Sequence, residues 1–163
     1  MNKYYKQVPE LPQLPSNLIL TLDDIIASGN ICPTGNIKTR ESIFAVYDAS
    51  QAIYDMYEPY FENKVFIRWQ VITADLPVHY DWGNSELKYL YLIDAGGEDV
   101  ITKFWSGQDG DITSGGSFNH EGRSLELEVK EKPLTWHYLN VKTPHSVVNV
   151  VRTRIALIIR PEY

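Results

Sequence analysis

Eight strand-like runs follow one another after residue 64, and they constrain the fold of this chain more than any other feature. Each run is short, is rich in β-branched and aromatic residues, and is bounded by turn residues such as Gly, Asn and Pro. Helical periodicity is missing from this part of the sequence. The pattern predicts a mainly β fold, a double-stranded β-helix or jelly roll. The predicted strands cover residues 65–73, 76–81, 88–93, 100–105, 124–130, 134–141, 146–150 and 153–159.

The residues before this region carry helical signals. Three prolines within residues 1–18 predict an extended arm that lies over the domain. Thr21, with Asp24 three residues later, forms a capping pattern that predicts a helix over 22–28. Apolar residues at helical spacing predict a second helix over 49–60. The buried face of the second helix is predicted to contain Ile53, Met56, Tyr57 and Tyr60.

The length of 163 residues predicts one domain, 1–163, with a single core. Within it, residues 1–63 form the arm and the supporting helices, which pack outside the barrel. Residues 64–160 form the jelly-roll catalytic core. The Gly/Ser-rich stretch 106–122 is expected to be a loop rather than a linker, because strands of one sheet system lie on both sides of it.

Charge and composition exclude several classes of protein. The chain has 15 basic and 21 acidic residues, a net charge of −6, and it lacks the basic face of a nucleic-acid binder. No apolar run reaches the roughly 20 residues that span a bilayer, and the N-terminus lacks a secretory h-region. Its single cysteine, Cys32, excludes a disulfide framework. We therefore expect a cytoplasmic protein without nucleic-acid or membrane partners; the sequence leaves its oligomeric state open.

The first chemical signal is the pair His79 and Asp81. Residues two apart in a strand point to the same face, so an imidazole and a carboxylate can converge on one metal ion. A histidine at a strand end with a hydrogen-bonded aspartate is the structural alternative.

His145 lies at the start of a late strand and supplies a second imidazole. Together with His79 and Asp81 it makes two histidines and one carboxylate, the facial set of non-haem iron(II) oxygenases, which leaves three coordination positions open. His137 is the rival third ligand, although a hydrogen-bonded strand histidine is the better interpretation of that residue.

Arg154 follows His145 by nine residues, within an apolar strand. When a 2-oxo acid chelates a metal through its keto and C1 carboxylate groups, a distal carboxylate is left pointing away. A guanidinium is a natural bidentate anchor for that group. An ion pair with one of the acidic residues is the alternative.

These four residues resemble the 2-oxoglutarate- and iron(II)-dependent oxygenases, with a pattern closest to the prolyl-hydroxylase-like branch. His79, Asp81, His145 and Arg154 occur in that family's order, on the second, seventh and eighth strands of eight. The resemblance implies a dioxygenase, usually a hydroxylase, that converts 2-oxoglutarate to succinate at iron(II). It also implies that Arg154 holds the 2-oxoglutarate, helped by a tyrosine of the third strand, for which Tyr91 is preferred over Tyr89.

The resulting hypothesis assigns catalysis and iron binding to His79, Asp81 and His145, and cosubstrate binding to Arg154 and Tyr91. The substrate, a small molecule or a peptidyl residue, stays open. The alternative is a non-catalytic, cupin-like module that binds a small molecule or a sugar, since one fold hosts many functions.

Overall fold

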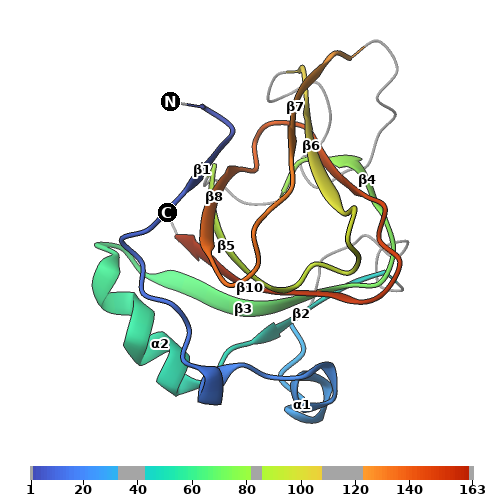
Figure 1. Cartoon of the computed structure of the whole chain (residues 1–163). Coiled ribbons are helices and arrows are strands. Elements are labelled where there is room, and N and C mark those ends of the chain that lie inside the picture. The colour runs from blue at the N-terminus through green and yellow to red at the C-terminus, as the bar shows by residue number, and fades with distance from the viewer. Residues whose placement is uncertain (1, 33–42, 82–85, 108–122, 162–163) are drawn as a thin grey trace.

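The computed structural model describes residues 2–32, 43–81, 86–107 and 123–161, in which two antiparallel sheets face each other (Figure 1). The loop predicted over 106–122 falls mostly outside these residues. The helices are α1 (Leu22–Ala27) and α2 (Gln51–Tyr57), with short 3-10 turns at Ser16–Leu18 and Glu58–Tyr60. The strands are β1 (Tyr5–Gln7), β2 (Phe44–Asp48), β3 (Val65–Ile72), β4 (Leu76–His79), β5 (Leu87–Asp94), β6 (Ile101–Trp105), β7 (Leu125–Val129), β8 (Trp136–Asn140), β9 (His145–Val148) and β10 (Arg154–Pro161).

The strand order confirms the predicted jelly roll. The larger sheet has the order β1-β8-β5-β10-β3-β2, and the smaller sheet has the order β4-β9-β6-β7. The eight strands from β3 onward therefore divide four and four between the sheets; they alternate between them except at β6 and β7, which are consecutive and pair in the smaller sheet, as in a double-stranded β-helix. β1 and β2 extend the two edges of the larger sheet. A strand was not predicted within the arm, where β1 lies, whereas β2 falls in a region whose sequence indicates a short strand over 42–47.

The larger sheet is covered on both faces, which explains why β10 is apolar at nearly every position. Ile155, Leu157 and Ile159 pack in an outer cluster with the helices and the arm. Ala156 and Ile158 pack in an inner cluster between the two sheets, beside Phe104 of the smaller sheet and other apolar residues. Full burial of each large aliphatic side chain is worth about 1.5–3 kcal/mol.

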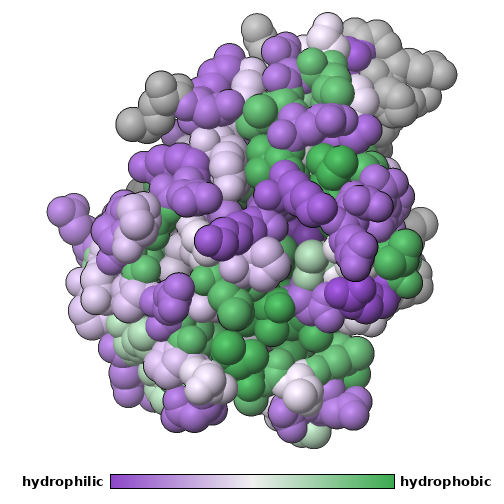
Figure 2. All heavy atoms as spheres, viewed as in Figure 1, coloured by the Kyte–Doolittle hydropathy of each residue, from purple (hydrophilic) through white to green (hydrophobic). Residues whose placement is uncertain are grey.

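The N-terminal region packs on the outer face of the larger sheet, where α1 and α2 lie below β3 in Figure 1. The arm is held there because the Tyr57 hydroxyl and the Trp136 indole N–H both donate to the carbonyl of Pro12, at 2.9 Å each. In Figure 2, hydrophobic side chains reach the surface in the lower part of the same view. The arm, the helices and the larger sheet share one hydrophobic cluster. The predicted boundary at residue 63, between the supporting region and the jelly-roll core, stays a prediction.

The first helix forms as predicted and the second is shorter. Thr21 and Asp24 make the reciprocal capping box of α1, with both contacts at 3.2 Å. The second helix ends at Tyr57 because Pro59 has no N–H to donate, and a 3-10 turn follows. The prediction that Tyr60 lies on the buried face is wrong: past this turn its side chain is 53% exposed.

Among the described residues, the helices are too short and too polar to cross a membrane.

Candidate metal site

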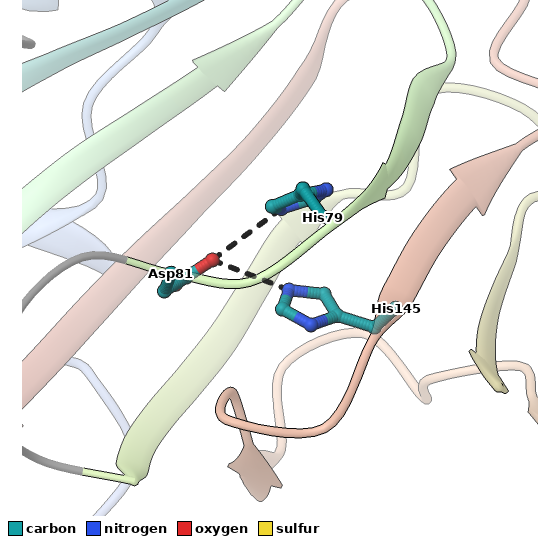
Figure 3. A group of neighbouring side chains, drawn as sticks. All are labelled: His79, Asp81 and His145. Atoms are coloured by element: carbon teal, nitrogen blue, oxygen red, sulfur yellow. Dashed lines mark ion pairs between the residues drawn. The ribbon is translucent and has the colours of Figure 1, made fainter. Parts of the chain in front are cut away.

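The side chains of His79, Asp81 and His145 point toward one another (Figure 3). The antiparallel pairing of β4 with β9 places His79 directly opposite His145, and their ring centroids are 4.3 Å apart. Asp81 lies two residues beyond His79, so it returns to the same face, and its N–H donates to the carbonyl of Val141. The predicted convergence of these three side chains is therefore present.

The three donor atoms match the geometry of one bound ion. The Nε2 atoms of His79 and His145 lie 3.3 and 3.2 Å from the same oxygen of Asp81, Oδ1. Two ligands at right angles, each about 2.1 Å from an ion, would be about 3.0 Å apart. The side chains are only 6%, 14% and 7% exposed for His79, Asp81 and His145, so the site is nearly dry.

The hydrogen bonds of the two imidazoles determine which nitrogen is free. The Nδ1–H of His79 donates to the carbonyl of Pro77 at 2.7 Å, and that of His145 to the carbonyl of Thr143 at 2.8 Å. A carbonyl can only accept, so Nδ1 of each ring carries a proton, and Nε2 is the nitrogen that each ring directs at Asp81. A backbone carbonyl that orients the imidazole in this way is typical of metal-ligating histidines.

The charges at the site favour a bound cation. Burial and, secondarily, His145 lower the pKa of His79 to about 4, so this imidazole is neutral near pH 7. Burial alone would raise the pKa of Asp81, but Lys88 and the two imidazoles outweigh it and hold that pKa well below its ordinary value. An ionised carboxylate oxygen and the Nε2 atoms of the two imidazoles thus face one another, and a bound cation can take the place of protons between them. This donor set could hold a metal ion.

Lys88 contacts the candidate metal site, and sequence reasoning missed it. Its side chain is buried, and its Nζ lies 3.1 Å from Oδ2 of Asp81, the oxygen that faces away from the imidazoles. Lys88 therefore leaves Oδ1 as the one oxygen of Asp81 that points at the metal position. The available signal was a charged residue near the start of β5, directly before the apolar run 89–93.

Arg154 lies between the sheets as its strand parity predicts, but its guanidinium already has a carboxylate partner. Its Nη2 is 3.4 Å from Oε2 of Glu131, and its Nη1–H donates to the carbonyl of Ala95 at 3.2 Å. Oε1 of Glu131 accepts from the hydroxyl of Thr102. The ion pair that the sequence left open as the alternative is therefore present, and Glu131 was not predicted as its partner.

Tyr91 lies neither with the candidate metal ligands nor with Arg154 and Glu131. Lys88, Leu90 and Leu92 of β5 face the space between the sheets, so Tyr91 faces the opposite side. There it packs in the outer cluster, with its ring centroid 5.1 Å from that of Trp136. The prediction that Tyr91 lines the cosubstrate site is wrong in this structure.

His137 is a hydrogen-bonded strand histidine, as preferred above. Its Nε2–H donates to the carbonyl of Lys132 at 2.9 Å, and its Nδ1 accepts from the hydroxyl of Tyr5 at 2.6 Å. Both nitrogens are thus used within the protein, and His137 lies outside the metal-ligand group.

Comparisons with known proteins add little to this geometry. No family model matches the chain, and no curated protein matches it in sequence. Among solved structures, a Bacillus subtilis oxalate decarboxylase is 12% identical with a TM-score of 0.40, over 74% of this chain and 26% of that one. Vicilin from Corylus avellana is 11% identical with a TM-score of 0.42, over 73% and 30%. This chain thus spans under a third of those structures, and the fold is established here by its own strand order.

Proposed function

We propose that this chain is a mononuclear iron(II) oxygenase that uses a 2-oxo acid as cosubstrate, with His79, Asp81 and His145 as the metal ligands. The observation that carries the proposal is the convergence of three donor atoms. Both imidazoles donate their Nδ1–H to backbone carbonyls and direct Nε2 at one oxygen of Asp81. Such a buried and oriented set of donor atoms is suited to a metal ion.

Each residue of the site has a part in this function. His79, Asp81 and His145 each offer one donor atom, so three positions of a six-coordinate ion stay open for a chelating cosubstrate and dioxygen. Lys88 holds the second oxygen of Asp81 away from the ion. The aromatic ring of Phe104, whose centroid is 6.1 Å from that of His145, shields this side of the site from water. Iron, when bound, supplies the capacity to activate dioxygen.

The sequence pattern predicts 2-oxoglutarate as the cosubstrate, with Arg154 as the anchor of its distal carboxylate. The contact between Arg154 and Glu131 does not fit that part of the prediction, because a protein carboxylate already lies against the guanidinium. The proposal therefore names a 2-oxo acid as the cosubstrate class. The substrate is a small molecule or a peptidyl residue.

One observation favours a second candidate, a module that binds a metal and a small ligand without oxidation. If Arg154 serves only to neutralise Glu131, the chain needs no anchor for a cosubstrate. Such a module would use the same three metal ligands.

Turnover separates the two candidates. The purified chain is loaded with iron(II) without oxygen and titrated with pyruvate, 2-oxobutyrate or 2-oxoglutarate, and the visible charge-transfer band of the chelate is recorded. We expect the band, and release of carbon dioxide once air is admitted. Asp81→Asn should abolish both signals, whereas Asp94→Asn, at a half-exposed aspartate that pairs with Arg152, should retain them. Metal binding without a band or carbon dioxide would favour the binding module.

A further inference from the structure

We infer that the candidate metal site takes up its cation together with an anionic ligand, and that Lys88 is the positioning residue that couples the two. The inference rests on the proposed function and deepens it: it names the charge of the ligand that completes the site and the side chain that sets this preference. It follows from the charges that surround Asp81.

The carboxylate of Asp81 stands between the metal position and a buried ammonium. Its Oδ1 faces the Nε2 atoms of His79 and His145 at 3.3 and 3.2 Å, and its Oδ2 lies 3.1 Å from the Nζ of Lys88. The side chain of Lys88 is only 7% exposed, so salt and water screen its charge weakly. An ion bound at Oδ1 would therefore be separated from this ammonium by a single carboxylate group.

The protein does not compensate the charge of such an ion. Histidine binds a metal as a neutral imidazole, so Asp81 is the one negative ligand of the three, and Lys88 already balances it. Lys142 adds a second ammonium, whose Nζ lies 3.5 Å from the backbone oxygen of Asp81. Within the described part of the chain, buried acidic side chains beyond this site are limited to Glu131, which faces Arg154. A divalent cation here keeps both of its positive charges.

A buried site with this excess of positive charge favours an anion over a neutral ligand. Unbalanced charge is costly in a dry interior, and an anion that coordinates the ion removes much of that cost. Because binding free energies are reciprocal, the cation and the anion each raise the affinity of the other. A charge about 4–6 Å away changes the proton affinity of a group by about 10–1,000-fold. We expect Lys88 to lower the affinity for the cation alone, and to raise that for the anion, by factors within this range.

Lys88→Met separates this role from a structural one, because its two effects have opposite signs. Dissociation constants are measured for cobalt(II) on the metal-free chain, and for azide, an anion, and imidazole, a neutral ligand, on the cobalt-loaded chain. Relative to the wild type, we expect Lys88→Met to bind cobalt(II) about tenfold or more tightly and azide about tenfold or more weakly, with imidazole changed by less than about threefold. Lys103→Met, which removes a lysine that pairs with the half-exposed Glu128, is the matched control and should change none of the three.

The outcomes distinguish this inference from the proposed function. If Lys88→Met binds cobalt(II) no more tightly than the wild type, or azide no more weakly, the inference is overturned while the proposed oxygenase stands. If the wild type binds no cobalt(II), both are overturned. If these constants behave as expected but no 2-oxo acid gives the charge-transfer band with iron(II), the proposed oxygenase alone is overturned.

The wild type provides a second measurement in case Lys88→Met does not fold, even with cobalt(II). Azide should bind the cobalt-loaded wild type about tenfold or more tightly than it binds aqueous cobalt(II), whereas imidazole should gain less than about threefold. Equal gains for the two ligands would overturn the inference.

Discussion

The space between the two sheets holds two buried polar clusters, and they differ in the groups that they bring together. The metal cluster, His79, Asp81 and His145, directs two imidazole nitrogens and one carboxylate oxygen at one point. The Arg154 cluster, which consists of Arg154, Glu131 and Thr102, sets a cation against an anion. Both are nearly inaccessible to water, and both contact β5, through Lys88 in the first and through Ala95 after the strand in the second.

The difference shows how a buried polar group can be assigned to binding or to structure. A buried guanidinium that faces a buried carboxylate already has a partner of opposite charge within the protein. Two imidazoles and a carboxylate that each direct one donor atom at one point form a set that could hold a metal ion. By this criterion the metal cluster is the candidate binding site, whereas Arg154, which by sequence alone fits a ligand anchor equally well, already faces Glu131.

The largest expected effect comes from breaking the Arg154 cluster. Arg154→Met should lower the free energy of unfolding by about 3–5 kcal/mol, because Glu131 would become an unpaired buried charge. Combining it with Glu131→Met should recover most of the loss, since an apolar replacement of a whole buried pair is often neutral. Urea unfolding of the three proteins measures both quantities.

Arg152→Met is the control for that experiment. Arg152 pairs with Asp94 at 3.0 Å, but the two side chains are 58% and 38% exposed, so the loss should stay within about 1 kcal/mol. If the double variant is no more stable than Arg154→Met, the loss does not come from an unpaired Glu131 charge, and the ion pair of Arg154 with Glu131 is contradicted.

The metal cluster should respond to an ion instead. Cobalt(II) at about 100 times its dissociation constant should stabilise the wild type by about 2.7 kcal/mol, which for a chain of this size raises Tm by about 5–10 °C. Glu131→Gln should show the same rise from its own starting Tm, whereas His145→Gln, which loses a ligand, should show almost none. Thermal unfolding with and without a chelator measures the effect. An equal rise in His145→Gln would place the ion elsewhere.

Much of the fold was predictable because its signals are local. Each of the eight later strands is a run of residues that must be buried on one or both faces, and such a run is visible in the sequence. β1 was not predicted, because its three residues are mostly exposed and only their pairing with β8 makes them a strand. The end of α2 was missed because Pro59 acts within an otherwise helical pattern.

The metal ligands were predictable for a similar reason. The spacing of His79 and Asp81 determines their common face, and His145 begins a strand of the same predicted barrel. The Tyr91 prediction was wrong because one residue of register decides which face a side chain occupies. Lys88 and Glu131 could not be assigned, since their partners Asp81 and Arg154 are brought to them only by the packing of strands.

The smallest expected effect is a pH dependence that belongs to His137, a neighbour of the Arg154 cluster. Burial lowers the pKa of His137, while the hydrogen bond to the carbonyl of Lys132 opposes this shift only in part. Below the ordinary imidazole pKa of about 6.5, the unfolded chain therefore binds a proton that the folded chain resists. Stability is then complete above pH 6.5 and falls as the pH decreases, by at most about 1.4 kcal/mol per pH unit for one histidine.

This slope should distinguish His137 from the metal ligands. Between pH 6.5 and 5 we expect His137→Gln to lose stability less steeply than the wild type, in urea unfolding without metal. Because the amide has no proton to gain, the difference between the two curves isolates the contribution of His137. The same difference should persist when cobalt(II) is present, since both nitrogens of His137 are bound within the protein and not to the ion. If the free energy of unfolding falls with pH equally steeply in both proteins, His137 binds its proton as readily in the folded chain as in the unfolded chain. That result would contradict the effect of burial on the pKa of His137.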